Sequence, residues 1–128
     1  MSADYALAVH RLARHIPAGS VLTYGDIAEL LGLGGPRQVG AAMARSDGAL
    51  PWWRVLRADG TLPADLQARA TPHWVEESIP LRHGRVRVPA ARWQPDEEAF
   101  AILDELASTL ASPVVVEETA PKRRGRML

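Results

Sequence analysis

The sequence predicts a mainly α-helical fold with one small β hairpin, organised around two short helices joined by a tight turn. Several segments place apolar residues at spacings of three and four, the pattern of a helix with one buried face. Gly32-Leu33-Gly34-Gly35 separates two such segments, and His83-Gly84 interrupts an extended run in the manner of a hairpin turn. With 128 residues, of which 47% are apolar, the chain has the size and composition of a single globular domain.

The N-terminal segment predicts a helix that ends near His15. Ser2 or Asp4 can cap its start, and Pro17-Ala18-Gly19 stops it. Its buried face is expected to contain Tyr5, Ala8, Val9, Leu12 and Ile16. Val21-Leu22 is too short for more than an extended link.

Two short helices are expected next. Thr23 and Asp26 have the spacing of a capping box, which predicts a helix from Tyr24 to Leu31. The glycines that follow can adopt positive φ angles and turn the chain. Pro36 suits the first position of the next helix, which is expected to end near Arg45. This arrangement fits a helix-turn-helix.

The second half is expected to hold an extended segment, a helix and the hairpin. Leu50–Leu56 is mostly apolar and predicts the extended segment, and a turn is expected at Ala58–Thr61. Residues 65–77 predict a helix that is interrupted at Pro72, and Ile79–Val88 predicts the hairpin.

A final helix is expected between Pro95 and Pro113. Its apolar stripe consists of Phe100, Leu103, Leu106, Ala107 and Leu110. We therefore expect one domain over residues 1–112 and a disordered tail over residues 113–128.

The charge of the chain is unevenly distributed. There are 15 basic and 15 acidic residues, and a net charge of zero argues against a simple nucleic-acid binder. However, residues 1–94 carry 11 basic and 8 acidic residues, and residues 95–119 carry 7 acidic residues and no basic one. The last nine residues carry four basic residues. A mildly basic body is thus followed by an acidic segment and a basic tip.

Composition excludes several classes of protein. The absence of cysteine excludes disulfides, thiolate metal sites and a catalytic thiol. No apolar run approaches the roughly 18–20 residues that a membrane span needs, and no export signal is apparent. We expect a cytoplasmic protein that has neither a membrane partner nor a cofactor. Four scattered histidines are interpreted as surface residues rather than metal ligands: His10, His15, His73 and His83.

Two features have both a structural and a functional interpretation. The outward positions of the second short helix are Arg37, Gln38, Gly40 and Ala41. Gly40 and Ala41 have almost no side chain, so this face permits close approach to a nucleic-acid groove, or to another helix of the same domain. Trp52 and Trp53 on an extended segment would point to opposite sides, so that one could stack on a nucleobase. Both could also be core residues.

These motifs, in this order, resemble the O6-alkylguanine-DNA alkyltransferases. The opening motif of that family is matched at residues 21–28 and its helix motif at residues 37–43. Its Pro-Cys-His-Arg-Val active-site motif is matched at residues 51–55 by Pro-Trp-Trp-Arg-Val. The resemblance covers roughly residues 3–62. It implies a winged helix-turn-helix-like DNA-binding domain similar to the C-terminal domain of the alkyltransferases.

The departures from the family pattern determine the expected function. Trp52 stands where the family has its acceptor cysteine, and an indole cannot replace a thiolate as the alkyl acceptor. No enzymatic activity is therefore expected. Tryptophan at this position is typical of alkyltransferase-like proteins, which bind O6-alkylguanine in DNA without repairing it. Trp53 departs from that branch as well, because the branch usually keeps a histidine there.

The resemblance implies a role for each matched residue. Arg37 would enter the base stack as the target base leaves, while Tyr24 would press on the phosphate 3′ to that base. The other residues expected in the minor groove are Pro36, Gln38, Gly40 and Ala41. The residues expected at the lesion pocket, besides Tyr24, are Trp52, Trp53, Arg54 and Val55. The backbone of Trp52 and Val55 would read the edge of the base, and Arg54 would act as a structural support.

The expected function is therefore that of a non-enzymatic, monomeric damage sensor. It would bind duplex DNA that contains O6-alkylguanine, flip the base out and mark the site for nucleotide excision repair proteins. One alternative is a helix-turn-helix regulator without lesion specificity, and another is a protein-interaction module. A base-processing enzyme is disfavoured, because no carboxylate pair, nucleophile–base pair or metal cluster stands out in the sequence.

Overall fold

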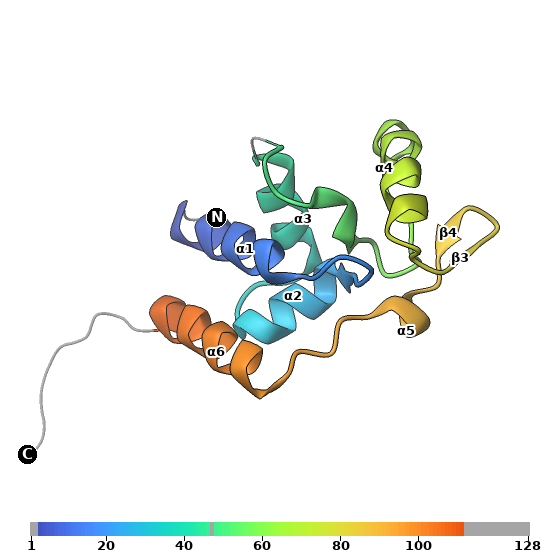
Figure 1. The fold of residues 1–128 in the computed structure, drawn as a ribbon. Coiled ribbons are helices and arrows are strands. Elements are labelled where there is room, and N and C mark those ends of the chain that lie inside the picture. Colours follow the sequence, from blue (N-terminus) through green and yellow to red (C-terminus); the bar gives the residue numbers. More distant parts are fainter. Residues whose placement is uncertain (1–2, 47, 112–128) are drawn as a thin grey trace, which may run out of the picture.

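The computed structural model describes residues 3–46 and 48–111, and it confirms a mainly helical fold with a small hairpin (Figure 1). The tail predicted at residues 113–128 lies outside the described residues. The elements are α1 Ala3–His15, β1 Leu22–Thr23, α2 Tyr24–Leu31, α3 Pro36–Ala44, a 3₁₀ helix Trp52–Arg54, β2 Val55–Leu56, α4 Ala64–Glu76, β3 Leu81–Arg82, β4 Arg85–Val86, α5 Val88–Ala91 and α6 Glu97–Ala111.

The first core lies among helices α1, α2, α3 and α6 (Figure 1). The predicted face of α1 is buried throughout, and Val9 and Leu12 are fully inaccessible. Thr23 and Asp26 form the predicted capping box, each side chain accepting a hydrogen bond of 3.0 Å from the backbone N–H of the other. Gly32 ends α2 with a φ of 70°, which a residue with a Cβ rarely adopts. The helix-turn-helix is thus fixed by local sequence signals.

A short parallel ladder joins the two halves of the chain. Leu22 pairs with Val55 and Thr23 pairs with Leu56. Val21 extends the contact through a bridge to Arg92. The prediction that Val21-Leu22 is only a link was therefore wrong, because the partner that completes the ladder lies far along the chain.

The second core lies under α4, the hairpin and α5, at the opposite end of the molecule from α6 (Figure 1). Pro72 was predicted to interrupt the helix, but α4 continues through it. Ala70 and Trp74, on either side of Pro72, are both fully buried. The indole N–H of Trp74 also donates to the carbonyl of Trp53 at 2.8 Å. Tertiary packing therefore outweighs the loss of one helical hydrogen bond.

The hairpin is closed by a two-residue turn and fastened to the turn that follows β2. His83 and Gly84 have φ angles of 53° and 78°, as a type I′ turn requires. The amide of Val86 donates to the carbonyl of Gly60 at 3.0 Å. Gly60 has a φ of 83°, and a Cβ there would lie 2.2 Å from the carbonyl oxygen of Val86. Only glycine therefore allows this close approach of the two backbones.

Helix α6 differs in detail from its prediction. It begins at Glu97, and Asp96 accepts a hydrogen bond of 2.8 Å from the amide of Ala99. Leu103 is buried as expected, but Phe100 is 44% exposed, since it lies at the rim of a surface hollow beside Trp93 rather than in the core. Within the described residues, no helix is long and apolar enough to cross a membrane.

Candidate nucleic-acid interface

The outward face of α3 is exposed as predicted. Pro36, Arg37, Gln38 and Ala41 are all exposed, while Gly40 is half-buried. Among the described residues, no carboxylate lies within 4.0 Å of the Arg37 guanidinium, so this side chain is not held by an ion pair. The side chain of Gln38 already has a partner within the protein, because its Oε1 accepts a hydrogen bond of 3.0 Å from the amide of Gly35. This face therefore presents Arg37, which has no ion-pair partner among the described residues, next to the small residues Gly40 and Ala41.

Tyr24 opens α2 and packs its ring against α3 at Gly40. A Cβ built on Gly40 would lie 3.6 Å from the Tyr24 ring, which is ordinary van der Waals contact. Burial raises the pKa of the Tyr24 phenol, and the nearby Arg57 charge only partly offsets this. Tyr24 therefore keeps its proton at neutral pH and presents a hydroxyl that can donate to a phosphate oxygen.

A cavity of about 370 Å³ opens beside this face. Four of the residues predicted for the site line it: Tyr24, Gly40, Trp52 and Val55. The remaining lining residues were not predicted: Met43, Ala44, Ser46, Gly48, Leu62, Pro63, Asp65, Leu66 and Arg69. Asp65, Leu66 and Arg69 have the spacing of one helix face, but nothing in the sequence indicated that this face of α4 would line a cavity with α3.

Trp52 lies where the two cores meet. It is half-buried and packs against both of them. The Arg69 guanidinium carbon lies 5.5 Å from the centroid of its ring, within the range of a cation–π contact. Trp52 therefore gives the cavity an aromatic surface with a cation beside it, which suits a flat and electron-rich ligand.

Trp53 and Arg54 were predicted at the pocket, but neither is among the residues that line this cavity. The adjacent tryptophans were also expected to alternate along an extended strand. Instead they lie on a 3₁₀ helix and meet edge to face, with centroids 5.7 Å apart. The 3₁₀ turn is closed by the Arg54 amide, which donates to the carbonyl of Pro51 at 3.0 Å. An ion pair between the Arg54 guanidinium and Glu77 stabilises it.

Behind the cavity, Glu77 connects Trp53, Arg54 and the loop that follows α1. The Trp53 indole N–H donates to Glu77 Oε2 at 2.9 Å, and Arg54 Nε donates to Oε1 at 3.0 Å. The Gly19 amide donates to Oε1 at 3.0 Å, and Arg54 Nη1 donates to the carbonyl of Ile16 at 2.8 Å. Burial alone would raise the pKa of Glu77, but these hydrogen bonds outweigh it and lower the pKa. Arg54 is thus a structural residue.

Two histidines are less exposed than expected. His73 stacks on Trp53, with centroids 3.8 Å apart and planes 8° apart. His10 donates from Nε2 to the carbonyl of Ala42 at 2.7 Å. Both side chains therefore have packing roles. In the part of the chain that the structure describes, no three histidine or acidic side chains form a group suited to a metal ion.

The backbone amides of Trp52 and Val55 already donate hydrogen bonds within the protein. The amide of Trp52 donates to the carbonyl of Leu50 at 2.7 Å, and the amide of Val55 donates to the carbonyl of Trp52. The role that the resemblance implies for the backbone of these two residues would therefore fall to their carbonyl oxygens.

Comparison with known proteins supports the family resemblance. The family described as 6-O-methylguanine DNA methyltransferase, DNA binding domain, matches residues 4–76. A DNA base-flipping protein of Escherichia coli is 34% identical over 91 residues, which are 66% of this chain and 70% of that protein. A DNA base-flipping protein of Vibrio parahaemolyticus is 29% identical over 98 residues, which are 72% of this chain and 98% of that protein.

Two solved structures share the fold. S. pombe Atl1 in complex with damaged DNA containing O6-carboxymethylguanine has a TM-score of 0.66 and 27% identity, over 74% of this chain and 99% of that one. S. pombe ATL in complex with DNA has a TM-score of 0.64 and 29% identity, with the same coverage. Together with Trp52 at the acceptor position, these matches show that the chain belongs to the 6-O-methylguanine DNA methyltransferase DNA-binding domain family, as an alkyltransferase-like protein.

Proposed function

We propose that this protein binds duplex DNA at O6-alkylguanine, flips the modified base out of the helix and holds it without removing the alkyl group. The observation that carries the proposal is the cavity of about 370 Å³ that opens between the exposed helix α3 and the aromatic surface of Trp52. The relatives named as DNA base-flipping proteins, and the Atl1 complex with O6-carboxymethylguanine, support the same activity.

The proposed binding mode places α3 in the minor groove. Pro36, Gln38 and Ala41 would approach the groove, and the half-buried Gly40 would allow Tyr24 to lie beside it. Arg37 would fill the gap that the base leaves, since its guanidinium has no ion-pair partner among the described residues. Flipping costs a few kcal/mol, and stacking in the cavity together with this filler would offset the cost.

The absence of alkyl transfer follows from the chemistry of the site. The chain contains no cysteine, and the indole of Trp52 is not a nucleophile for alkyl groups. A bound lesion would therefore persist and bend the DNA, which other proteins can detect. We propose that nucleotide excision repair proteins receive this signal. The protein would act as a monomer, through a domain of residues 1–112, on the cytoplasmic nucleoid where its DNA lies.

A titration of short duplexes tests this proposal. One duplex carries a single O6-methylguanine and the other carries guanine at the same position, and binding is read from tryptophan fluorescence and gel shift. We expect tighter binding and stronger quenching with the lesion, with the methyl group still on the DNA after incubation. Arg37→Ala should reduce the affinity for the lesion, while Arg14→Ala, an exposed arginine on α1, should not. Equal affinity for both duplexes would instead indicate a helix-turn-helix regulator without lesion specificity.

The proposed handover to excision repair has a separate test in cells. Loss of the gene should increase sensitivity to alkylating agents in an excision-competent background and have no further effect in an excision-deficient one. Equal sensitivity in every background would contradict the handover and leave the binding activity in place.

A further inference from the structure

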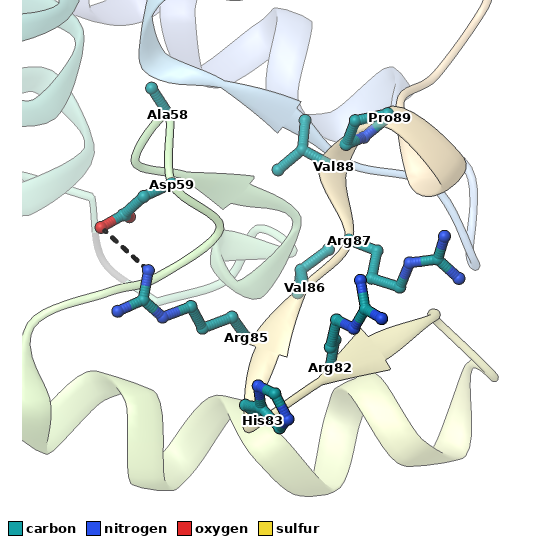
Figure 2. A pocket seen from close by; sticks show the side chains of 9 residues that line it. All are labelled: Ala58, Asp59, Arg82, His83, Arg85, Val86, Arg87, Val88 and Pro89. Atoms are coloured by element: carbon teal, nitrogen blue, oxygen red, sulfur yellow. Dashed lines mark ion pairs between the residues drawn. The ribbon is translucent and has the colours of Figure 1, made fainter.

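A basic surface lies outside the predicted site. It lines a shallow hollow between the β3–β4 hairpin and the turn after β2, and its cations are Arg82, Arg85 and Arg87 (Figure 2). Among the residues that line the hollow, Asp59 is the only acidic one. The hollow therefore carries an excess of positive charge, although the chain as a whole has none.

These arginines are not neutralised by the protein. Arg85 approaches Asp59 at 4.0 Å, but both side chains are more than half exposed, so the pair is weak. Within the described ranges, Arg82 and Arg87 have no carboxylate within 4.0 Å. Figure 2 shows Arg85 extending toward Asp59, while Arg82 and Arg87 extend on the other side of β4. Arg82 and Arg87 have no ion-pair partner among the described residues, so an anion bound beside them would meet two unneutralised positive charges.

The hairpin holds these side chains at a fixed position relative to the cavity. Val86 lies between Arg85 and Arg87 and is buried, and its amide donates to the carbonyl of Gly60 at 3.0 Å. The amide of Arg87 donates to the carbonyl of Pro80 at 2.9 Å. The turn that contains Gly60 directly follows β2, whose Val55 lines the cavity. Backbone hydrogen bonds therefore link the hairpin to the β2 side of the cavity.

Arg57 lies in the chain between β2, which reaches the cavity, and Asp59, which lines the hollow. Its charge acts on the phenol of Tyr24, whose pKa is raised mainly by burial. It also acts on Asp59, whose pKa is lowered first by the hydrogen bond from Thr61 and then by the Arg85 and Arg57 charges. Arg57 is exposed, and its charge acts on both Tyr24 at the cavity and Asp59 at the hollow.

We propose that the hollow formed by Arg82, Arg85 and Arg87 binds backbone phosphates of the same duplex, as a second anchor beyond α3. This inference rests on the proposed function, because the duplex must first dock at Tyr24 and the cavity. Arginine suits the role, since its planar guanidinium donates two parallel hydrogen bonds to one phosphate. The anchor contacts only the backbone, so it adds affinity without discriminating between modified and unmodified bases.

The test removes two charges without disturbing the fold. Arg82→Gln/Arg87→Gln replaces two exposed side chains that have no ion-pair partner among the described residues. The matched control, Arg11→Gln/Arg14→Gln, removes two exposed arginines from α1, at the opposite end of the molecule from the hairpin (Figure 1). Dissociation constants are measured for the lesion duplex and the plain duplex over a range of salt concentrations.

We expect the hairpin variant to reduce the slope of log affinity against log salt by about 2, since each phosphate contact contributes about 0.9. The fall in affinity between about 50 and about 200 mM salt should become roughly tenfold smaller. The ratio of lesion to plain affinity should be unchanged, and the α1 variant should behave as the wild type does. Inorganic phosphate, added as a competitor at constant ionic strength, should not displace the duplex, because the anchor engages several phosphates on one backbone.

The outcomes separate this inference from the proposed function. If the wild type prefers the lesion duplex and the hairpin variant keeps the full salt slope, the second anchor is wrong and the proposed function stands. If the hairpin variant loses lesion preference rather than overall affinity, the anchor is also wrong, because the hollow would then act on the base. If the wild type binds neither duplex, both proposals fall together.

Discussion

Replacing Glu77 with alanine is expected to destabilise the fold by about 3–5 kcal/mol, the cost of breaking a buried ion pair from one side. The estimate follows from the geometry, because the side chains of Arg54 and Glu77 are only 15% and 11% exposed. The variant leaves the Arg54 guanidinium with the Ile16 carbonyl as its partner, and it also removes the acceptor of Trp53 and Gly19. Such a loss is a large part of the 5–15 kcal/mol that typically stabilises a domain.

Urea denaturation followed by tryptophan fluorescence measures this change. Glu76→Ala is the matched control, because Glu76 is the preceding residue of α4 and is exposed. Glu77→Gln should be milder, since an amide oxygen still accepts hydrogen bonds although the charge is lost. If Glu77→Ala unfolds before it can be measured, Glu77→Gln still provides the comparison. The reasoning would be refuted if Glu77→Ala and Glu76→Ala unfolded at the same urea concentration.

The lowered pKa of Glu77 also predicts the direction of the pH dependence. A carboxyl whose pKa is lower in the folded state stabilises the protein above its unfolded pKa, and this stabilisation is lost as the pH falls through the folded pKa. The free energy of unfolding should therefore decrease below the ordinary carboxyl pKa of about 4. Glu77→Gln should flatten this decrease, whereas Glu76→Gln should leave it as steep as in the wild type.

Three further predictions concern the hairpin and the cavity. Gly60→Ala should destabilise the fold more than Gly48→Ala does. Both glycines have a φ of 83°, but only a Cβ at position 60 would meet a neighbour, the carbonyl of Val86. Equal midpoints of urea denaturation for the two variants would contradict this. Tyr24→Phe should retain stability and weaken lesion binding by about 0.5–1.5 kcal/mol, the net worth of one hydrogen bond, as measured by fluorescence titration. Arg69→Leu should reduce the affinity for an O6-carboxymethylguanine duplex relative to an O6-methylguanine duplex. The reason is that Arg69 lines the cavity and can pair with the added carboxylate. An unchanged ratio of the two affinities would argue against that pairing.

Local signals were sufficient to predict the helix-turn-helix from the sequence. The capping box of Thr23 and Asp26, the glycine with positive φ at position 32 and Pro36 at the first position of α3 each act within a few residues. The hairpin turn at His83-Gly84 was predicted for the same reason. Such elements can be derived from a single sequence because no distant partner is needed to decide their conformation.

The elements that depend on distant partners were not predictable in this way. The 3₁₀ helix at Trp52–Arg54 is stabilised by Glu77, and the continuation of α4 through Pro72 is stabilised by the burial of Trp74. The same limit applied to the cavity, where the residues contributed by α4, such as Arg69, were missed. Their position depends on how α4 packs, which the periodicity of its own sequence does not determine.

The ladder of two residue pairs between β1 and β2 determines which wall of the cavity can move when a larger ligand binds. Thr23 precedes Tyr24 and is paired with Leu56, which follows Val55. Tyr24 and Val55, which both line the cavity, are therefore held in a fixed position relative to each other. The opposite wall is the N-terminal part of α4, where the Gln67 side chain bonds the Leu62 amide at 2.9 Å and the Gly84 carbonyl at 3.0 Å. The C-terminal part of α4 is anchored by the buried Trp74, whose indole N–H donates to the carbonyl of Trp53. Accommodation of bulkier adducts should therefore come from the first turns of α4, which carry Asp65, Leu66 and Arg69, and not from a movement of the whole helix. The upper size limit for a ligand would then be set by how far this end of α4 can move and not by Trp52.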